Sequence, residues 1–400
     1  MSLNSGSKYL LNVGVVGAGI GGLVAALCFS RKNCKVTVIE KTELKGEAGA
    51  GIQLSPNCLK VLFDLGLEPQ LRHFSSCPKS IDISDWKKGR IIKETRLNPE
   101  CMGKYGLPYY HIHRGDLLRI LRDHAQKRNN IDLELNSEVV EVTENDEKAT
   151  LILDSGLSRD FDVIVGADGI NSAVAKVLGL SHRPQFTGNV AWRALVPKTA
   201  VARELDDEKG SLWLGPGKHF VHYPVRKGDL VNCICVAGGR DWRDESWITR
   251  ADLAELTSEF SQWNPALRAL INKIEEGSLF KWALFHRPSL SCWHKKRTVL
   301  LGDACHATLP FLAQGAAMAI EDASVLSSCM ERDKEISAAF ATYQKLRRPR
   351  VVSIQRISRV NELLFHSNRL LAPLRDLILK NFSGYTLNNV YKYNALSAGD

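Results

Sequence analysis

The first forty residues alternate between short apolar runs and one glycine-rich turn. An apolar run at Asn12–Val16 leads into Gly17-Ala18-Gly19-Ile20-Gly21-Gly22, and a second run at Lys35–Glu40 ends in an acid. Between them, apolar positions recur at helical spacing (Ile20, Leu23, Val24, Leu27 and Cys28). The pattern predicts a buried strand, a tight turn, a helix and a second strand.

Strand-like alternation returns downstream. Residues 78–95 alternate like paired strands, and a helix is expected after 113–116 with Asp116 as its cap. Residues 133–142 and 150–153 are predicted strands, and 162–166 form a buried run that ends at Gly166-Ala167-Asp168-Gly169. Residues 184–285 are rich in tryptophan and in alternation, with a helical stretch near 251–260. After a last buried run at 298–301, helical spacing continues to the end.

These elements predict an α/β protein: a Rossmann-like dinucleotide-binding domain with an inserted β-sheet substrate domain and C-terminal helices. We expect residues 1–183 and 286–345 to form the first domain, with 78–104 contributing to the substrate domain. Residues 184–285 are the expected substrate sheet, and 346–400 the helical segment. Residues 10–30 also fit a signal peptide or membrane span, but five glycines and no small-residue cleavage site disfavour that alternative.

The charge and the cysteine spacing of the chain limit which classes of ligand and partner are expected. The net charge is +9, but the basic clusters at 295–297 and 347–350 are short enough to be solvated faces. No basic stripe with aromatic platforms supports nucleic-acid binding, so the charge is expected to attract anionic small molecules. The ten cysteines contain no C-x-x-C, which disfavours a zinc ribbon and a dithiol centre. We expect reduced cysteines, no metal site and a cytoplasmic protein without stable membrane insertion.

The glycine-rich turn has the chemistry of a dinucleotide site. Gly17 permits the tight turn, Gly19 lets a pyrophosphate approach the helix N-terminus, and Gly22 lets the helix pack on the strand. Glu40 follows at the distance typical of an acid that binds ribose hydroxyls. Ile20 and Lys41 flank these positions and are included among the candidate cofactor-binding residues.

A second glycine motif, Gly302-Asp303-Ala304-Cys305-His306, lies far downstream and precedes Pro310 and Gln314-Gly315. Together with the glycine motifs at 17–22 and 166–169, it resembles the single-component flavoprotein aromatic hydroxylases. That class includes salicylate hydroxylase, 6-hydroxynicotinate monooxygenase and p-hydroxybenzoate hydroxylase. The resemblance implies non-covalent FAD, with NAD(P)H and O2 as co-substrates, and oxygen transfer to an aromatic ring through a flavin C4a-hydroperoxide.

The resemblance also implies roles for individual residues. Asp303 would bind the ribityl chain, Arg114 would lie beside the phosphates, and Asp168 would lie near the pyrophosphate. The start of a helix at Gln314, Gly315 and Ala316, after Pro310, would face the flavin ring with its backbone amides. The structural alternatives are a turn cap for Asp303, a turn residue for Asp168 and a surface arginine for Arg114. His306 is expected to support the glycine turn or the flavin edge.

The candidate catalytic residues are His219 and Tyr223, which would face one side of a strand. Their spacing resembles that of a histidine and a tyrosine in the 6-hydroxynicotinate branch, where a base beside a ring hydroxyl would favour the more nucleophilic phenolate. A structural histidine is the alternative. Gln53, Arg193 and Phe311 are further substrate-site candidates, with Arg193 as a possible carboxylate clamp.

Other flavoproteins share parts of this pattern. A halogenase would carry W-x-W-x-I-P, which Ala191–Pro197 does not match, and a disulfide reductase would need the absent C-x-x-C. A non-catalytic flavin-binding electron carrier is the remaining alternative. The expected partner is a small aromatic molecule, and the protein is expected to be a monomer or homodimer.

Overall fold

A six-stranded sheet forms the centre of one of the two parts of the fold. The computed structural model describes residues 10–43, 50–180, 184–201, 208–239, 242 and 249–398. The strand order is β17-β18-β11-β1-β2-β7, with parallel pairing except between β17 and β18. The strands are β1 (Asn12–Val16), β2 (Lys35–Glu40), β7 (Ile131–Leu135), β11 (Val163–Gly166), β17 (His294–Lys295) and β18 (Thr298–Leu300).

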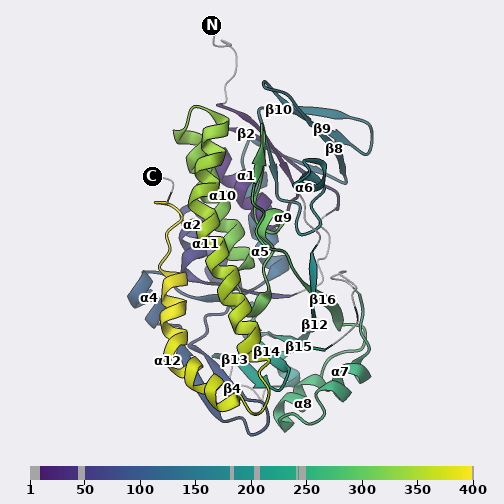
Figure 1. Cartoon of the computed structure of the whole chain (residues 1–400), viewed down its shortest axis with the longest axis vertical. Coiled ribbons are helices and arrows are strands. Elements are labelled where there is room, and N and C mark those ends of the chain that lie inside the picture. The colour runs from purple at the N-terminus through teal and green to yellow at the C-terminus, as the bar shows by residue number, and fades with distance from the viewer. Residues whose placement is uncertain are drawn as a thin grey trace.

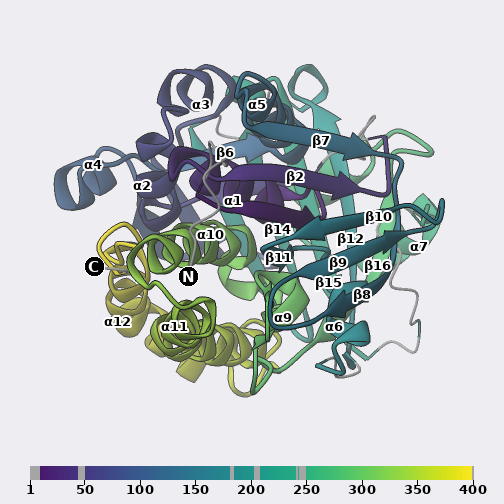
Figure 2. The ribbon, with the colours of Figure 1, turned by 90° about the horizontal axis from the view of Figure 1, so that it is seen from above.

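Helices cover this sheet, whose central strands β1, β11 and β18 are almost entirely buried. The helix α1 (Ile20–Arg31) packs against α5 (Arg114–Gln126) and α10 (Gly315–Arg332), and α10 packs against α2 (Pro56–Asp64). The three strands β8 (Val139–Glu144), β9 (Ala149–Leu153) and β10 (Ser158–Phe161) form a separate sheet on the other side of β11 from α10 (Figure 2). Two short strands, β3 (Gly51–Leu54) and β6 (Tyr110–His113), pair with each other near α2.

A seven-stranded sheet forms the centre of the other part of the fold, with the strand order β16-β12-β15-β14-β13-β4-β5. Its strands are β4 (Ser80–Asp85), β5 (Ile91–Arg96), β12 (Gln185–Pro197), β13 (Lys209–Gly215), β14 (Lys218–Val225), β15 (Leu230–Ala237) and β16 (Phe280–His286). Two strands from residues 78–104 therefore share a sheet with strands from residues 184–285. The domain boundaries themselves stay a prediction.

The two faces of this sheet bury different clusters. One packs on α7 (Leu253–Glu259) and α8 (Pro265–Ile271), and contains Phe220, Cys233 and Cys235. The opposite face packs on Phe311 and Phe365. Alternate residues of β14 and β15 thus point to opposite faces, as the period of two predicts.

The long helix α11 (Ile336–Phe365) joins the two parts. It runs along the long axis of the molecule, from the region of α1 and β2 to the region of β13 and β14 (Figure 1). The remaining elements are the helices α3 (Glu68–Phe74), α4 (Glu100–Tyr105), α6 (Ala173–Val177), α9 (Asp303–His306) and α12 (Ala372–Tyr391), and the 3-10 turns η1 (Lys198–Ala200), η2 (Arg226–Gly228) and η3 (Pro310–Leu312). No helix in the described ranges is long and apolar enough to cross a membrane.

The structure corrects two expectations. The helix α5 begins at Arg114 with His113 as its N-cap, so Asp116 lies inside the first turn. Its carboxylate accepts a hydrogen bond from Arg226 Nε at 2.8 Å instead of capping the helix. The cluster at 347–350 is also not a solvated face, because Arg347 is fully buried and only Arg348 and Pro349 are exposed.

Arg347 is buried because α10 supplies it with two buried carboxylates. Its guanidinium lies 2.7 Å from Glu321 Oε2 and 2.7 Å from Asp322 Oδ1. Arg350 adds two bonds to the Glu321 carboxylate at 2.6 and 2.7 Å. Burial alone would raise the pKa of Asp322, but His306 and Arg347 lower that pKa to about 2. We name this cluster, comprising Glu321, Asp322, Arg347 and Arg350, the α10–α11 ionic cluster.

Replacing Arg347 should strongly destabilise the fold. Arg347→Met leaves two carboxylates buried without their shared cation, and loss of one partner from a buried pair costs about 3–5 kcal/mol of unfolding free energy. Chemical denaturation measures this cost. Arg348→Ala, at the exposed neighbouring position, should change the unfolding free energy by less than ~0.5 kcal/mol. Equal stabilities of the two variants would contradict the assigned role of the cluster.

Candidate active site

In the glycine turn after β1, Gly19 borders open space, whereas Gly17, Gly21 and Gly22 are tightly packed. Gly17 has φ of +100°, which a side chain rarely tolerates. A Cβ on Gly22 would lie 1.9 Å from the Gly17 carbonyl oxygen, so only glycine lets α1 pack there. A Cβ on Gly19 meets no atom within 4 Å. The backbone at Gly19 therefore borders open space at the N-terminus of α1, where Ile20 is the first helical residue.

Glu40 lies beside this turn. Its Oε2 accepts a hydrogen bond from the Ala18 amide at 2.8 Å, and its Oε1 accepts one from the Thr42 hydroxyl at 2.8 Å. The carboxylate thus connects the end of β2 to the glycine turn, at the edge where a ribose is expected. Lys41 is exposed on the solvent side.

Asp303 and Arg114 line a recess. The Asp303 side chain is exposed, yet the surrounding protein desolvates it enough to raise its pKa, against the opposing charges of His306, Arg114 and Arg287. A group that water reaches but protein surrounds lies in a concave site. Burial likewise lowers the pKa of Arg114, while Asp303 opposes that shift. The structure therefore brings together two residues that are almost 190 positions apart in the sequence.

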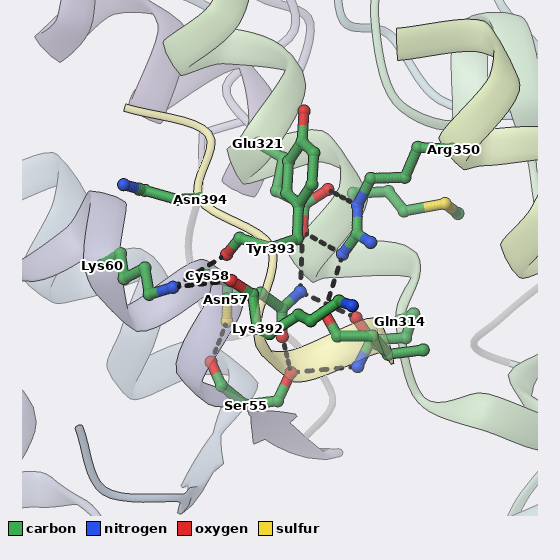
Figure 3. Close-up of polar contacts among 12 residues, drawn as sticks. Ser55, Asn57, Cys58, Lys60, Gln314, Glu321, Arg350, Lys392, Tyr393 and Asn394 are labelled. Atoms are coloured by element: carbon green, nitrogen blue, oxygen red, sulfur yellow. Dashed lines mark hydrogen bonds and ion pairs between the residues drawn. The ribbon is translucent and has the colours of Figure 1, made fainter. Parts of the chain in front are cut away.

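A polar cluster fixes the start of α10 beside this recess (Figure 3). The buried Gln314 side chain points toward α2, where its Nε2 donates to Ser55 Oγ at 2.9 Å and its Oε1 accepts from Asn57 Nδ2 at 3.0 Å. Asn57 Nδ2 also donates to Glu321 of the α10–α11 ionic cluster at 2.7 Å. No side chain in the described ranges caps α10, so the first-turn amides, including those of Gly315 and Ala316, stay available to an anion or polar ring.

The loop before α10 is conformationally constrained. Pro310 begins η3 and is exposed, and Ala313 has φ of +52° in the left-handed region. A non-glycine residue in that region costs energy and is common at ligand sites. Asp322 of α10 holds the glycine turn at Gly302, which precedes this loop. Its Oδ2 accepts a hydrogen bond from the Gly302 amide at 3.0 Å and lies 2.5 Å from His306 Nε2. His306 therefore supports the glycine turn, as expected.

The seven-stranded sheet presents one face to this loop. The His219 and Phe311 rings are 5.3 Å apart between centroids, so β14 meets the loop after Pro310. His219 and Tyr223 are both buried on β14, with Val221 between them. Burial lowers the pKa of His219 well below its usual value, so its imidazole is neutral at physiological pH. Burial raises the pKa of Tyr223, so its phenol is neutral as well.

Tyr223 connects this face to the β3–β6 pair. A Cβ on Gly51 would lie 2.8 Å from the Tyr223 hydroxyl oxygen, so the absence of a side chain at 51 makes room for the ring. Gln53, two residues along β3, accepts a hydrogen bond from the Tyr109 hydroxyl at 2.6 Å. Gln53 is thus on the same short strand that borders Tyr223, though its side chain is engaged with Tyr109.

Arg193 lies on the same face, two strands from β14. Both Arg193 and Val221 pair with Ile234 of β15, which places their backbones about 9–10 Å apart. Arg193 is 4% exposed and lies over the Trp282 ring at 5.6 Å from its centroid. Burial and the charge of Arg114 lower its pKa to about 10, so it stays cationic at neutral pH. A buried cation near the sheet face suits an anionic group of a substrate.

Among the candidate cofactor-binding residues, Asp168 has a clear structural role in its own turn. Its Oδ2 accepts a hydrogen bond from the Val174 amide at 3.1 Å, which ties the turn after β11 to α6. Burial raises the pKa of this carboxyl. The turn-residue alternative is thus supported, while contact with a cofactor stays a prediction.

Sequence reasoning missed the partners that position the site. The carboxylates of Glu321 and Asp322 stand within an otherwise apolar helical pattern, and this was the available signal for a buried ionic cluster. His366, at the end of α11, carried no such signal. Its Nε2 lies 2.9 Å from Nδ1 of His219, and only the folded chain brings the two rings together.

Both the sequence and the fold of the chain are similar to those of known proteins. The model of the FAD-binding domain family matches residues 11–358. The chain is 34% identical over 355 residues to a 3-amino-4-hydroxybenzoate 2-monooxygenase of Streptomyces platensis, covering 88% of each chain. It is 33% identical to the 6-hydroxynicotinate 3-monooxygenase of Bordetella bronchiseptica over 88% of this chain and 91% of the relative. A salicylate hydroxylase, solved as a substrate complex, superposes with a TM-score of 0.82 at 25% identity over 98% of each chain.

The open space at Gly19 predicts a selective loss of flavin. Gly19→Ala adds a methyl group that meets no protein atom, so the apoprotein should fold with unchanged thermal stability. The methyl group intrudes where the pyrophosphate approaches the helix, so purified protein should lose its flavin absorbance. Gly22→Ala is the contrasting variant, because its methyl group clashes with backbone and should lower apoprotein stability. Full flavin content in Gly19→Ala protein would rule out this position for the pyrophosphate.

Proposed function

The chain belongs to the FAD-dependent aromatic hydroxylases, and we propose that it uses NAD(P)H and O2 to hydroxylate a small aromatic acid that carries a ring hydroxyl. The observation that carries this proposal is the contact between the rings of His219 and Phe311. It joins the proposed substrate face of the seven-stranded sheet to the loop that precedes α10. A ring placed there would lie between the sheet and the first-turn amides of α10.

The residues present fit FAD. The open backbone at Gly19 would take the pyrophosphate with Arg114 beside it, the carboxylate of Glu40 would take a ribose, and Asp303 would take the ribityl chain. Bound FAD, once reduced by NAD(P)H, would supply the reaction with O2 and the transfer of oxygen. The chain's own residues bind and orient both molecules, exclude water and move protons. The amides of Gly315 and Ala316 would stabilise negative charge on the ring system.

The substrate face favours a hydroxylated aromatic acid. Arg193 supplies a buried cation for a carboxylate, and pairing with that group would offset its desolvation. The named relatives act on a hydroxybenzoate and a hydroxynicotinate, which both combine a ring hydroxyl with a carboxylate. Phe311, Val221 and Leu212 offer apolar contact to the ring. Gln53 pairs with His111, whose ring centroid lies 4.3 Å from that of Tyr223, and this supports Gln53 as part of the same substrate site.

His219 is the proposed general base. Its neutral imidazole can accept the proton of the ring hydroxyl, and the resulting phenolate is a better nucleophile toward an electrophilic oxygen. Because the pKa of His219 is lowered, the acceptor form persists at mildly acidic pH and is lost only as the pH falls toward that pKa. Tyr223, neutral by burial, would donate a hydrogen bond to the substrate.

A panel of paired ring compounds tests the proposal. Hydroxylated aromatic acids should stimulate NADH or NADPH oxidation and O2 uptake, and the same rings without the carboxylate should do so less. His219→Ala should keep its flavin but hydroxylate about 10²–10⁴-fold more slowly, with hydrogen peroxide replacing the lost product. A matched change of an exposed histidine, His73→Ala, should leave the rate unchanged.

Two results separate the parts of this proposal. Normal hydroxylation by His219→Ala protein would remove the general base but leave the monooxygenase. If no ring compound raises NAD(P)H oxidation above background, the hydroxylase assignment fails, and the electron-carrier alternative gains support.

A further inference from the structure

His219 shares its Nδ1 with a second histidine. The distance from Nδ1 to Nε2 of His366 is 2.9 Å, which is a direct hydrogen bond between the two rings. His366 comes from the C-terminal end of α11, about 150 residues away from His219. Its backbone fixes its position, because its amide donates to the Glu362 carbonyl at 3.1 Å and its carbonyl accepts from the Gly217 amide at 3.3 Å.

The pair runs from a buried position toward the surface. His219 is 4% exposed, whereas His366 is half-buried. The Phe311 ring packs against both imidazoles, with its centroid 5.3 Å from that of His219 and 5.5 Å from that of His366, and the Phe365 ring lies 5.6 Å from His219. Because the surrounding side chains are apolar, the hydrogen bond between the two histidines is a polar link from the proposed substrate face of β14 to the end of α11.

Both rings are neutral at physiological pH, so their contact defines a pair of linked tautomers. Burial lowers the pKa of His366 to about 4, and burial together with His366 lowers the pKa of His219 well below its usual value. One ring must then donate and the other must accept. When Nδ1 of His219 donates to Nε2 of His366, Nε2 of His219 is left as an acceptor.

We propose that His219 and His366 form a proton relay that carries the proton of the substrate hydroxyl out of the site; this inference rests on the proposed function. The ring hydroxyl gives its proton to Nε2 of His219. The Nδ1 proton of His219 passes to Nε2 of His366, and the Nδ1 proton of His366 passes to solvent. One proton leaves, no electrons move, and both rings end neutral in the opposite tautomer. His366 is therefore a positioning and relay residue.

The charged groups on neighbouring elements are engaged elsewhere. Glu362, one turn earlier on α11, accepts a hydrogen bond from Asn189 at 2.6 Å. Lys218, next to His219 on β14, pairs with Glu259, and Arg369, beyond the end of α11, stacks over Trp86. Within the described part of the chain, no carboxylate shifts the pKa of either imidazole, so the pair should titrate as a unit.

His366→Gln tests the relay, because a glutamine amide can hydrogen-bond to His219 but cannot pass a proton onward. With the best substrate from the panel, hydroxylation should slow by about tenfold to a hundredfold, below the full effect of losing a general base. The wild-type rate should be flat between pH 6 and 8. The variant's rate should rise with pH, because the substrate must then lose its proton to solvent, and a phenol does so increasingly as the pH approaches ~10.

Rescue separates proton transfer from a structural role. Added imidazole should restore hydroxylation by His366→Ala protein, in which the deleted ring leaves a path to His219. Flavin content and thermal stability of each variant identify any failure to fold. His294→Gln, the same change on β17 at the edge of the six-stranded sheet, is the matched control and should keep the wild-type rate and pH profile.

The outcomes distinguish the relay from the proposed function. An active wild-type enzyme whose His366→Gln form keeps the wild-type rate and flat pH profile would overturn the relay alone. Slowed variants with an unchanged pH profile and no imidazole rescue would show that His366 only packs against His219, which also overturns it. A wild-type protein that hydroxylates no compound in the panel would overturn the proposed function and the relay together.

Discussion

The site depends on two adjacent carboxylates buried in the middle of α10. Glu321 and Asp322 are fully buried, and their partners come from α2, from α11, and from the turn and short helix α9 that contain Gly302 and His306. Glu321 binds Asn57 of α2 and Arg350 of α11, while Asp322 binds the Gly302 amide, His306 and Arg347. Separating these charges from their partners costs several kcal/mol, so the cluster makes the geometry of the recess inseparable from the stability of the fold.

The proposed chemistry follows from how two sheets meet. The six-stranded sheet ends in glycine turns that leave backbone amides and open space, which is how such folds bind dinucleotides. The seven-stranded sheet contributes side chains on one face, among them Arg193 and His219. Phe311, in the loop before α10, packs against His219 on that face, so the proposed cofactor site and the proposed substrate face would share a boundary.

What could be predicted from the sequence was local. The turn at 17–22 and the alternation of β14 follow from neighbouring residues, and both were predicted correctly. Arg347 was mistaken for a surface residue because its partners lie 25 and 26 positions earlier, on another helix. Asp116 was mistaken for a cap because the helix starts three residues earlier than its pattern suggests. His366 could not be found, since its link to His219 arises only when the end of α11 reaches β14.

The central claim is that the protein transfers one atom of molecular oxygen to an aromatic ring. Turnover of the best panel substrate under ¹⁸O2, followed by mass spectrometry of the product, tests this most directly. The account predicts that each newly formed ring hydroxyl carries one ¹⁸O atom and that ¹⁸O from labelled water is not incorporated. A hydroxylated product whose new oxygen derives from water would contradict the account.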